Sequence, residues 1–143
     1  MPTDTDSFAF FHTISIAAEA EDVPHIDNIR FFQFIQDARL AYFDAAGCPG
    51  HDPVTNTGHA IVVNHCEYIG ELIGPDTLSV GVKALTLGSS SIKLAFRLFS
   101  ERQQRVVAEA YCVAVLFDFA NHCKLAISND LRERIKLLET TAP

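Results

Sequence analysis

Residues 29–46 form a strongly hydrophobic segment with the pattern of a helix. Twelve of these 18 residues are apolar, and the only charged ones are Arg30, Asp37, Arg39 and Asp44. Asp27 or Asn28 is expected to cap the N-terminus by accepting a backbone N–H, and Gly47 followed by Pro49 is expected to end the helix. A helix that is apolar on nearly all sides is normally buried, so we expect the rest of the chain to enclose it.

Five further segments have the pattern of strands. Alternating apolar positions or turn signals place them at residues 7–16, 58–68, 77–87, 90–99 and 105–119. The last four are separated by turns of hairpin length, at residues 74–76, 88–89 and 101–104, so the sheet is expected to be antiparallel. Residues 47–58, rich in Gly, Pro, Asn and Asp, predict a loop, and residues 128–138 predict a short terminal helix.

The face patterns of two strands indicate where the core lies. In residues 90–99, one face is uniformly apolar and consists of Ile92, Leu94, Phe96 and Leu98. In residues 105–119 both faces are apolar, which is typical of a central strand that is covered on both sides.

The order of the predicted elements is a strand, a long buried helix, four antiparallel strands and a short helix. This order describes an α+β fold in which a sheet of about five strands curls round one central helix, the hotdog arrangement. With 143 residues, 48% of them apolar and 11 of them Phe, the chain is expected to form a single domain over residues 1–143.

Composition excludes several classes of partner. The 18 acidic residues exceed the 11 basic ones and give a net charge of −7, which argues against non-specific binding to nucleic acid. The predicted helix, with four charges in 18 residues, is a poor membrane span, so no membrane association is expected. The N-terminus has no secretory signal pattern, which predicts a cytoplasmic protein.

The cysteines predict neither disulfides nor a metal site. Cys48, Cys66, Cys112 and Cys123 include no CxxC pair, and we expect reduced thiols, most of them buried. His65 and His122 each precede a cysteine, but neighbouring strand residues point to opposite faces and do not converge on one ion. No metal site is therefore expected.

Several motifs along the chain resemble one enzyme family. Residues 24–39 read PHIDNIRFFQFIQDAR and are similar to the signature G-H-V-N-N-x-x-Y-x-x-Y-F-E-x-A-R of hotdog thioesterases of the 4-hydroxybenzoyl-CoA thioesterase type. Residues 67–78, 87–91 and 107–110 resemble that family's Y-x-x-P-x-x-x-G-D-x-L, G-x-S-S and V-A-E-G motifs in the same order. The resemblance covers roughly residues 8–138.

The resemblance implies hydrolysis of acyl-CoA or related thioesters, without a metal or a cofactor, by a homodimer or a dimer of dimers with sites at the dimer interface. The family's catalytic Asp lies four residues before the signature His, a position that Glu21 occupies here, and Asp22 is the alternative if the loop register differs by one residue. Pro24 and Asp27 replace the family's Gly and first Asn.

Thioester hydrolysis needs an attacking group and a partner for the developing oxyanion. We expect Glu21 to be the base or nucleophile and backbone N–H groups near Asn28 and Ile29 to polarise the carbonyl. His25 and Asn28 are expected to orient the site, with His25 as an alternative base.

The anionic end of CoA, or an acidic acyl carrier protein, needs a local basic or polar patch. The best candidates are Ser89, Ser90, Ser91, Lys93 and Arg97, with Lys83 or Lys124 next. Arg39, on the helix, is expected to have a structural role and to pair with a carboxylate such as Glu67 or Asp37 of a neighbouring subunit.

The leading hypothesis is an acyl-CoA thioesterase. The alternative is a non-catalytic hotdog protein that binds an acyl thioester or a fatty acid, suggested by the departures at Glu21, Pro24 and Asp27. A third interpretation, hydration or dehydration of an acyl thioester with His25 as base, ranks lower.

Overall fold

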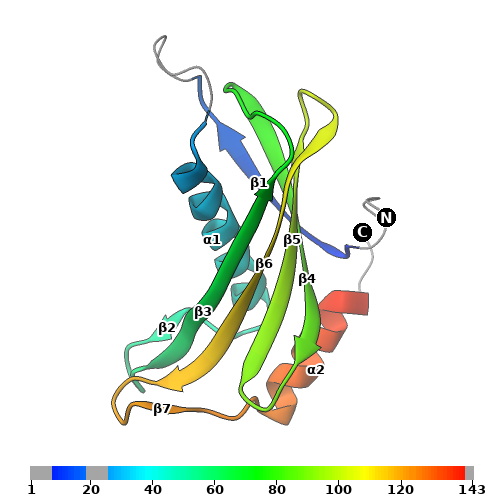
Figure 1. Ribbon diagram of the computed structural model, residues 1–143. Coiled ribbons are helices and arrows are strands. Elements are labelled where there is room, and N and C mark those ends of the chain that lie inside the picture. The colour runs from blue at the N-terminus through cyan, green and yellow to red at the C-terminus, as the bar shows by residue number, and fades with distance from the viewer. Residues whose placement is uncertain (1–7, 19–25, 141–143) are drawn as a thin grey trace.

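The computed structural model describes residues 8–18 and 26–140. Two helices and seven strands follow one another along this part of the chain (Figure 1). In chain order they are β1 (Phe10–Ile16), α1 (Asn28–Ala45), β2 (His51–Asp52), β3 (Thr57–Tyr68), β4 (Asp76–Leu87), β5 (Ser91–Ser100), β6 (Arg105–Asp118), β7 (Cys123–Lys124) and α2 (Asn129–Thr140).

All described strands belong to one antiparallel sheet, with the order β1-β4-β5-β6-β3-β2 and with β7 paired to β6. The predicted number of about five strands was too low, because β2 and β7 have only two residues each and carry no periodic signal. β2 lies within the predicted loop 47–58, where Asn56 adopts a φ of 54° and returns the chain, so that His51 pairs with Gly58.

The predicted helix 29–46 is confirmed as α1, within one residue at each end. Asp27 is the N-cap and accepts a hydrogen bond from the Arg30 N–H at 3.1 Å. At the C-terminus, the N–H groups of Gly47 and Cys48 donate to the carbonyls of Asp44 and Phe43, which is the Schellman motif. Gly47 adopts the positive φ, 72°, that this motif requires.

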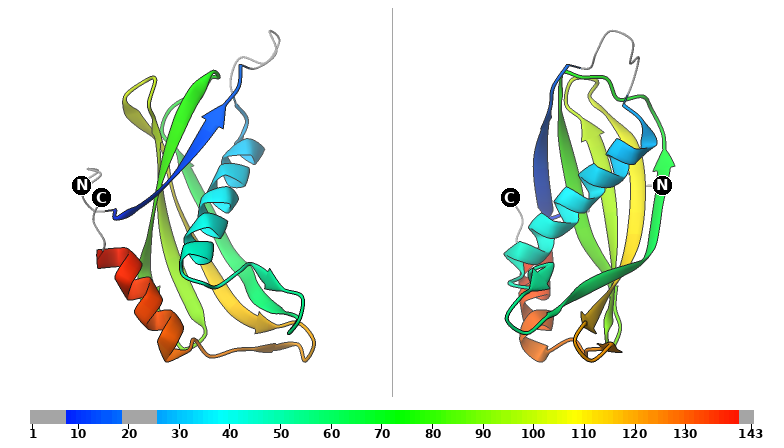
Figure 2. Two further views of the ribbon diagram at one scale, coloured as in Figure 1. Left: turned by 180° about the vertical axis from the view of Figure 1, so that it is seen from behind. Right: turned by 90° about the vertical axis from the view of Figure 1, so that its left-hand side faces the viewer.

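The sheet curls round α1 but covers only one of its faces (Figure 2). The covered face consists of Phe31, Phe34, Ile35, Ala38, Arg39, Tyr42 and Phe43. On the opposite face Ile29 is 64% exposed and Leu40 is 40% exposed. The expectation that the chain encloses the helix completely was therefore wrong, because the single sheet layer reaches only one side.

The inner face of the sheet forms the core together with α1. Ile92, Leu94, Phe96 and Leu98 of β5 are buried there, as predicted. β6 is central, between β5 and β3, also as predicted. The prediction that both faces of β6 are covered was wrong for the described part of the chain. Tyr111 and Val113, on the outer face, remain partly exposed.

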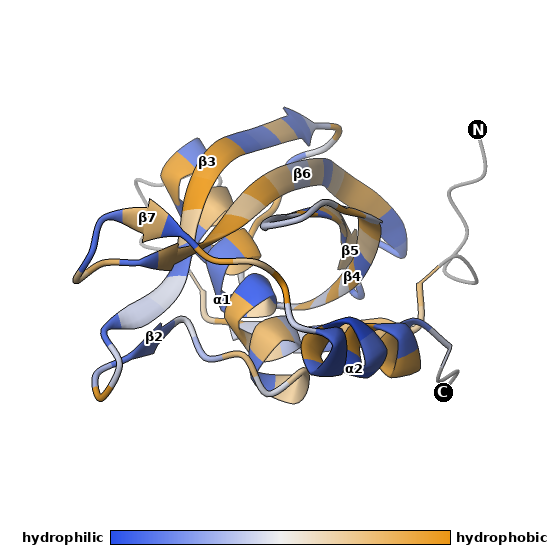
Figure 3. Ribbon diagram, turned by 90° about the horizontal axis from the view of Figure 1, so that it is seen from below, coloured by the Kyte–Doolittle hydropathy of each residue, from blue (hydrophilic) through white to orange (hydrophobic). Residues whose placement is uncertain are grey.

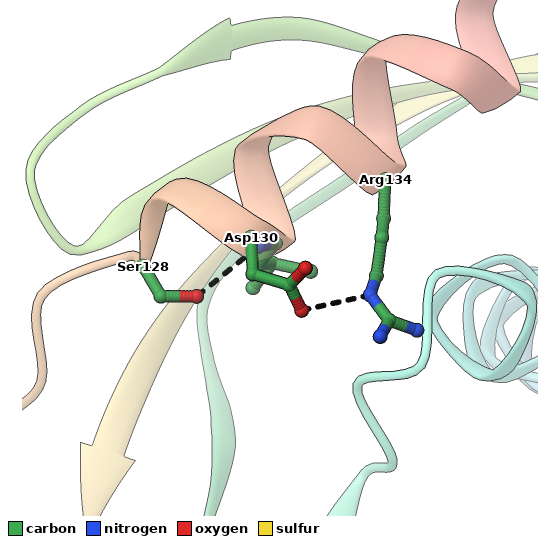
Figure 4. Close-up of polar contacts among 4 residues, drawn as sticks. Ser128, Asp130 and Arg134 are labelled. Atoms are coloured by element: carbon green, nitrogen blue, oxygen red, sulfur yellow. Dashed lines mark hydrogen bonds and ion pairs between the residues drawn. The ribbon is translucent and has the colours of Figure 1, made fainter.

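α2 packs beside the sheet near β4, with its largely hydrophilic side outward (Figure 3). The Ser128 hydroxyl caps α2 by accepting from the Leu131 N–H at 3.1 Å, and Arg134 pairs with Asp130 at 2.9 Å (Figure 4). Near the other end of α2, the Glu139 carboxylate accepts hydrogen bonds from the Tyr42 hydroxyl and the Ala84 N–H. These two bonds join α2 to both α1 and β4.

Candidate functional site

The N-terminus of α1 presents backbone donors that pair with no described residue. The Asp27 side chain accepts from the Arg30 N–H, and the Asp27 carbonyl accepts from the Phe31 N–H. The N–H groups of Asn28 and Ile29, in the first turn, have no acceptor within the helix or elsewhere in residues 8–18 and 26–140. Within this part of the chain both are open to a ligand, at the positive end of the helix dipole.

A cavity of about 520 Å³ opens beside these donors. Its apolar wall consists of Ile26, Phe31, Tyr68 and Ile69, and its polar rim consists of Asp27, Asn28 and Glu71. The Phe31 and Tyr68 rings meet edge to face, with centroids 5.1 Å apart. An apolar wall next to free N–H donors suits an acyl group whose carbonyl oxygen points at the helix.

Of the residues predicted for the catalytic site, one lines this cavity and the others cannot be placed. Asn28 lies on its rim, at the first residue of α1. Glu21 and His25, and with them Asp22 and Pro24, lie outside the described residues. The chain re-enters the described region at Ile26, whose N–H donates to the Leu72 carbonyl at 2.8 Å and fixes the start of α1 against the segment after β3.

Glu71 is a carboxylate of the cavity that the sequence did not single out. It follows β3 in a segment without regular structure, and its side chain is exposed. The only sequence signal was its place between two quoted motif residues, Tyr68 and Pro75. Packing of this segment against the start of α1 brings Glu71 and Asn28 to one rim.

Four of the five candidate CoA residues, Ser89, Ser90, Ser91 and Lys93, lie toward the other end of the sheet, whereas Arg97 pairs with Glu109 of β6, next to the residue that pairs with Tyr68. Ser89, Ser90 and Ser91 occupy the β4–β5 turn and the start of β5, and Ser91 pairs with Val115 of β6. Tyr68, at the cavity, pairs with Ala108 of β6. At about 3.3 Å per residue, Ala108 and Val115 are about 23 Å apart. Within one chain, the serines of the β4–β5 turn are therefore too far from the cavity to belong to the same site.

Lys93 and Arg97 project from the outer face of β5, and both already contact aromatic rings. The Lys93 ammonium lies 4.6 Å from the Tyr111 ring centroid. Arg97 is 6% exposed, donates to the Glu109 carboxylate at 3.3 Å and lies 4.8 Å from the Phe8 ring centroid. Of the two cations, Lys93 is the more accessible to a phosphate.

Arg39 is not paired as the sequence suggested. Its side chain is 6% exposed and contacts the Cys112 thiol in the core, and none of the ion pairs among the described residues involves it. The prediction of Glu67 as partner was wrong, because Glu67 lies on the exposed part of β3 and contacts His65 instead. Burial of Arg39 beneath its own helix likewise keeps it from a carboxylate of a neighbouring subunit.

The four cysteines are free thiols. Burial raises the pKa of the thiols of Cys48, Cys66 and Cys112, so they are protonated at neutral pH. Within residues 8–18 and 26–140, no three metal-ligating side chains come together. No helix of these segments is long and apolar enough to cross a bilayer.

A second cavity, of about 250 Å³, lies at the opposite end of α1, next to Cys48, Asp52 and Arg134. It is smaller and more polar, and it meets the carbonyl end of α1, which repels a developing negative charge. The larger cavity at the N-terminus of α1 is therefore the better candidate for an acyl-transfer site.

Solved structures share this fold across nearly the whole chain. The PA5185 protein of Pseudomonas aeruginosa superimposes with a TM-score of 0.80 at 23% identity, covering 96% of each chain. A thioesterase superfamily protein of Jannaschia sp. CCS1 gives a TM-score of 0.81 at 15% identity, covering 95% of this chain and 87% of that one. For the SAV2348 protein of Staphylococcus aureus the TM-score is 0.78 at 14% identity, covering 94% and 85%.

Similarity in sequence points the same way. The chain is 26% identical over 91 residues to the uncharacterized protein YsmA of Bacillus subtilis strain 168. That match spans 63% of this chain and 60% of YsmA, less than two thirds of its length. A family model described as the thioesterase-like superfamily matches residues 2–135. Because this match includes nearly all of the chain, the protein belongs to the thioesterase-like superfamily.

Proposed function

We propose that the protein hydrolyses an acyl-CoA thioester to a carboxylic acid and free CoA at the cavity beside the N-terminus of α1. The observation that carries this proposal is the junction of an apolar cavity of about 520 Å³ with the free N–H groups of the first turn of α1. Membership of the thioesterase-like superfamily supports it. The SAV2348 protein, whose structure was characterised in complex with CoA, supports CoA as the thiol.

In the proposed reaction, the acyl group lies against Phe31 and Tyr68 and its carbonyl oxygen accepts from the N–H groups of Asn28 and Ile29. Glu21 takes a proton from a water molecule, whose oxygen attacks the carbonyl carbon. The C–S bond then breaks, and the leaving CoA thiolate takes up the proton. The other route is direct attack by the carboxylate, which expels the thiolate and gives a mixed anhydride that water then hydrolyses to the acid and free Glu21. His25 and the Asn28 side chain orient the loop and the water.

Glu71 is the second candidate for the carboxylate, because it shares the cavity rim with Asn28. Asp27 is less suitable, since one of its oxygens already accepts the Arg30 N–H as the helix cap. Glu21 and Glu71 are therefore alternative catalytic carboxylates, which separate substitutions can distinguish.

For the nucleotide end of CoA we propose Ser89, Ser90, Ser91 and Lys93, with Arg97 contributing if it leaves Glu109. In one chain the three serines and Lys93 lie far from the cavity, which favours a site completed by a partner subunit, whereas Arg97 pairs with Glu109 near the level of Tyr68. The proposal of a CoA thioesterase of the 4-hydroxybenzoyl-CoA type rests on the motif resemblance.

The test is release of free thiol from a panel of acyl-CoAs by the purified protein and its variants. We expect Glu21→Gln to lower kcat by about 100-fold or more, the usual contribution of a general base, and Glu71→Gln to lower it far less. Glu133→Gln, an exposed glutamate on α2, is the matched control and is expected to keep wild-type activity. Wild-type kcat in Glu21→Gln together with a large loss in Glu71→Gln would transfer the role to Glu71.

The second candidate is a protein that binds acyl thioesters without hydrolysing them. The use of Asp27 as a helix cap, at a position where the family has Asn, favours this alternative. Titration calorimetry with a non-hydrolysable acyl-CoA analogue, next to the thiol-release assay, separates the two functions. Binding without turnover by the wild-type protein would replace the enzymatic proposal.

We further propose that the protein is a homodimer formed along the outer edge of β3. Beyond Gly58, β3 has no neighbour on this edge among the described strands. Val62 and Tyr68 there are 60% and 47% exposed. A long unpaired strand edge of this kind is a template for pairing with a second strand, and a second copy of β3 supplies an antiparallel one.

The dimer is tested by light scattering after size exclusion. We expect Val62→Lys to raise the dissociation constant at least about tenfold, since a charge replaces apolar contact at the centre of the edge. Val54→Lys is the control, because Val54 is 92% exposed at the tip of the turn between β2 and β3. A monomeric wild-type protein, or equal dissociation constants for wild type and Val62→Lys in a dilution series, would contradict the arrangement.

A further inference from the structure

Arg39 and Arg97 are equally buried, at 6% exposure each, but their surroundings differ. Arg97 has a carboxylate partner, since its Nε donates to Glu109 at 3.3 Å. Arg39 contacts the Cys112 thiol, and its Nε has no hydrogen-bond partner among the described residues. A thiol is a weak acceptor and carries no charge when protonated. The charge of Arg39 is therefore uncompensated within this part of the chain.

A second unsatisfied group lies in the same region of the core. Phe43 follows Arg39 by one helical turn on the buried face of α1, and the His59 ring packs on Phe43 with centroids 4.2 Å apart. The buried Nε2 atom of His59 also has no hydrogen-bond partner among the described residues. Burial and the charge of Arg39 lower the pKa of His59 to about 4, so its ring is neutral at pH 7.

Buried polar atoms without partners are rare in folded proteins, and a buried cation without an anion is costly. The groups that face this region are a guanidinium, a neutral imidazole and a thiol whose pKa burial raises. A neutral imidazole presents one N–H, and a guanidinium presents several, so together they offer donors and one positive charge but no negative one. This donor set suits a small anion.

We propose that the core between α1 and β3 holds one small monovalent anion, of the size of chloride, bound by the Arg39 guanidinium and by the Nε2–H of His59. The anion neutralises the buried charge and accepts hydrogen bonds from the two unpaired nitrogens, Nε of Arg39 and Nε2 of His59. It is a structural ligand at the C-terminal half of α1, apart from the acyl cavity at the N-terminus, so it does not depend on the proposed function.

Chloride itself is the first probe. Thermal unfolding of the full chain is followed by far-UV circular dichroism at pH 7.5, with sodium chloride replaced by sodium gluconate at constant ionic strength. Above the dissociation constant, we expect each tenfold rise in chloride to raise Tm by about 3–5 °C, because an anion that binds only the folded state stabilises it by mass action. An unchanged Tm would overturn the proposal.

Two arginine variants assign the effect to one site. Arg39→Met keeps the length of the side chain and removes the charge, and is expected to abolish the chloride response. Arg97→Met removes an equally buried arginine that has its own carboxylate, and is expected to keep the response even though its Tm falls. Loss of the response in Arg97→Met but not in Arg39→Met would overturn the assignment.

Two measurements that do not use Arg39→Met remain decisive if that variant does not fold. Crystals grown in sodium bromide are expected to show an anomalous peak beside the Arg39 guanidinium, whereas a peak without anomalous signal would identify a water molecule and overturn the proposal. Thiolate absorbance at 240 nm is expected to be the same for wild type and Cys112→Ser. A loss of absorbance in Cys112→Ser would make the Cys112 thiolate the counterion instead.

Discussion

Replacing Asp76 with alanine is expected to lower the free energy of unfolding by about 3–4 kcal/mol, because several buried or partly buried donors lose their acceptor at once. Asp76 is 8% exposed and accepts hydrogen bonds from the Ser100 hydroxyl at 2.5 Å, the Thr77 N–H at 2.7 Å and the Arg102 N–H at 3.0 Å. These bonds hold the start of β4 against the end of β5 and the turn that follows. Urea unfolding followed by far-UV circular dichroism measures the loss.

Asp52→Ala is the matched control for this measurement. Asp52 also accepts a backbone N–H, from Val54 at 3.0 Å, but in an exposed turn where water replaces the bond. Its loss is expected to cost less than about 1 kcal/mol. Similar losses for the two variants would show that Asp76 does not organise this end of the sheet.

The contribution of Asp76 also depends on pH in a defined direction. Burial raises the pKa of Asp76, but hydrogen bonds from Ser100, Arg102 and Thr77 outweigh burial and hold the pKa below its ordinary value of 3.8. Because the folded pKa is the lower one, the stabilisation is complete above about pH 4 and is lost as the pH falls below it.

Acidification from pH 6.5 to pH 4 is expected to destabilise the protein by about 3 kcal/mol through His59 alone, at 1.36 kcal/mol per pKa unit. Burial first, and then the charge of Arg39, lower the pKa of His59 from 6.5 to about 4. The unfolded chain therefore takes up a proton at a higher pH than the folded one, and stability falls as the pH drops through this window.

The measurement compares the free energy of unfolding of wild type and His59→Phe between pH 7.5 and pH 4, in chloride-free gluconate buffer so that no bound anion offsets the charge of Arg39. Phenylalanine keeps the ring against Phe43 but does not titrate, so the difference between the two profiles isolates His59. We expect wild type to lose about 3 kcal/mol more than the variant over this range. Parallel profiles would mean that His59 is not held neutral in the folded protein.

Local patterns in the sequence were sufficient for most of the fold. The helix 29–46 and the five long strands were placed within one to three residues of their observed bounds, because hydrophobic periodicity, Asp27, Gly47 and the turn residues are local signals. The two-residue strands β2 and β7 were missed because pairing across a turn leaves no periodic trace. The apolar outer residues of α1 were taken for core, although composition alone does not show how many sides a sheet reaches.

The candidate site divides in the same way. The sequence by itself predicted an 18-residue helix at residues 29–46, within one residue of α1, behind an acidic segment, and showed which motifs resemble a thioesterase. Only the tertiary structure decided that Tyr68 and Glu71 share a cavity with Asn28, that Ser91 and Lys93 lie at the far end of the sheet, and that Arg39 contacts Cys112 and not a carboxylate. The physical reason is that such contacts join residues far apart in the chain, and long-range packing, unlike a cap or an alternating strand, has no local pattern.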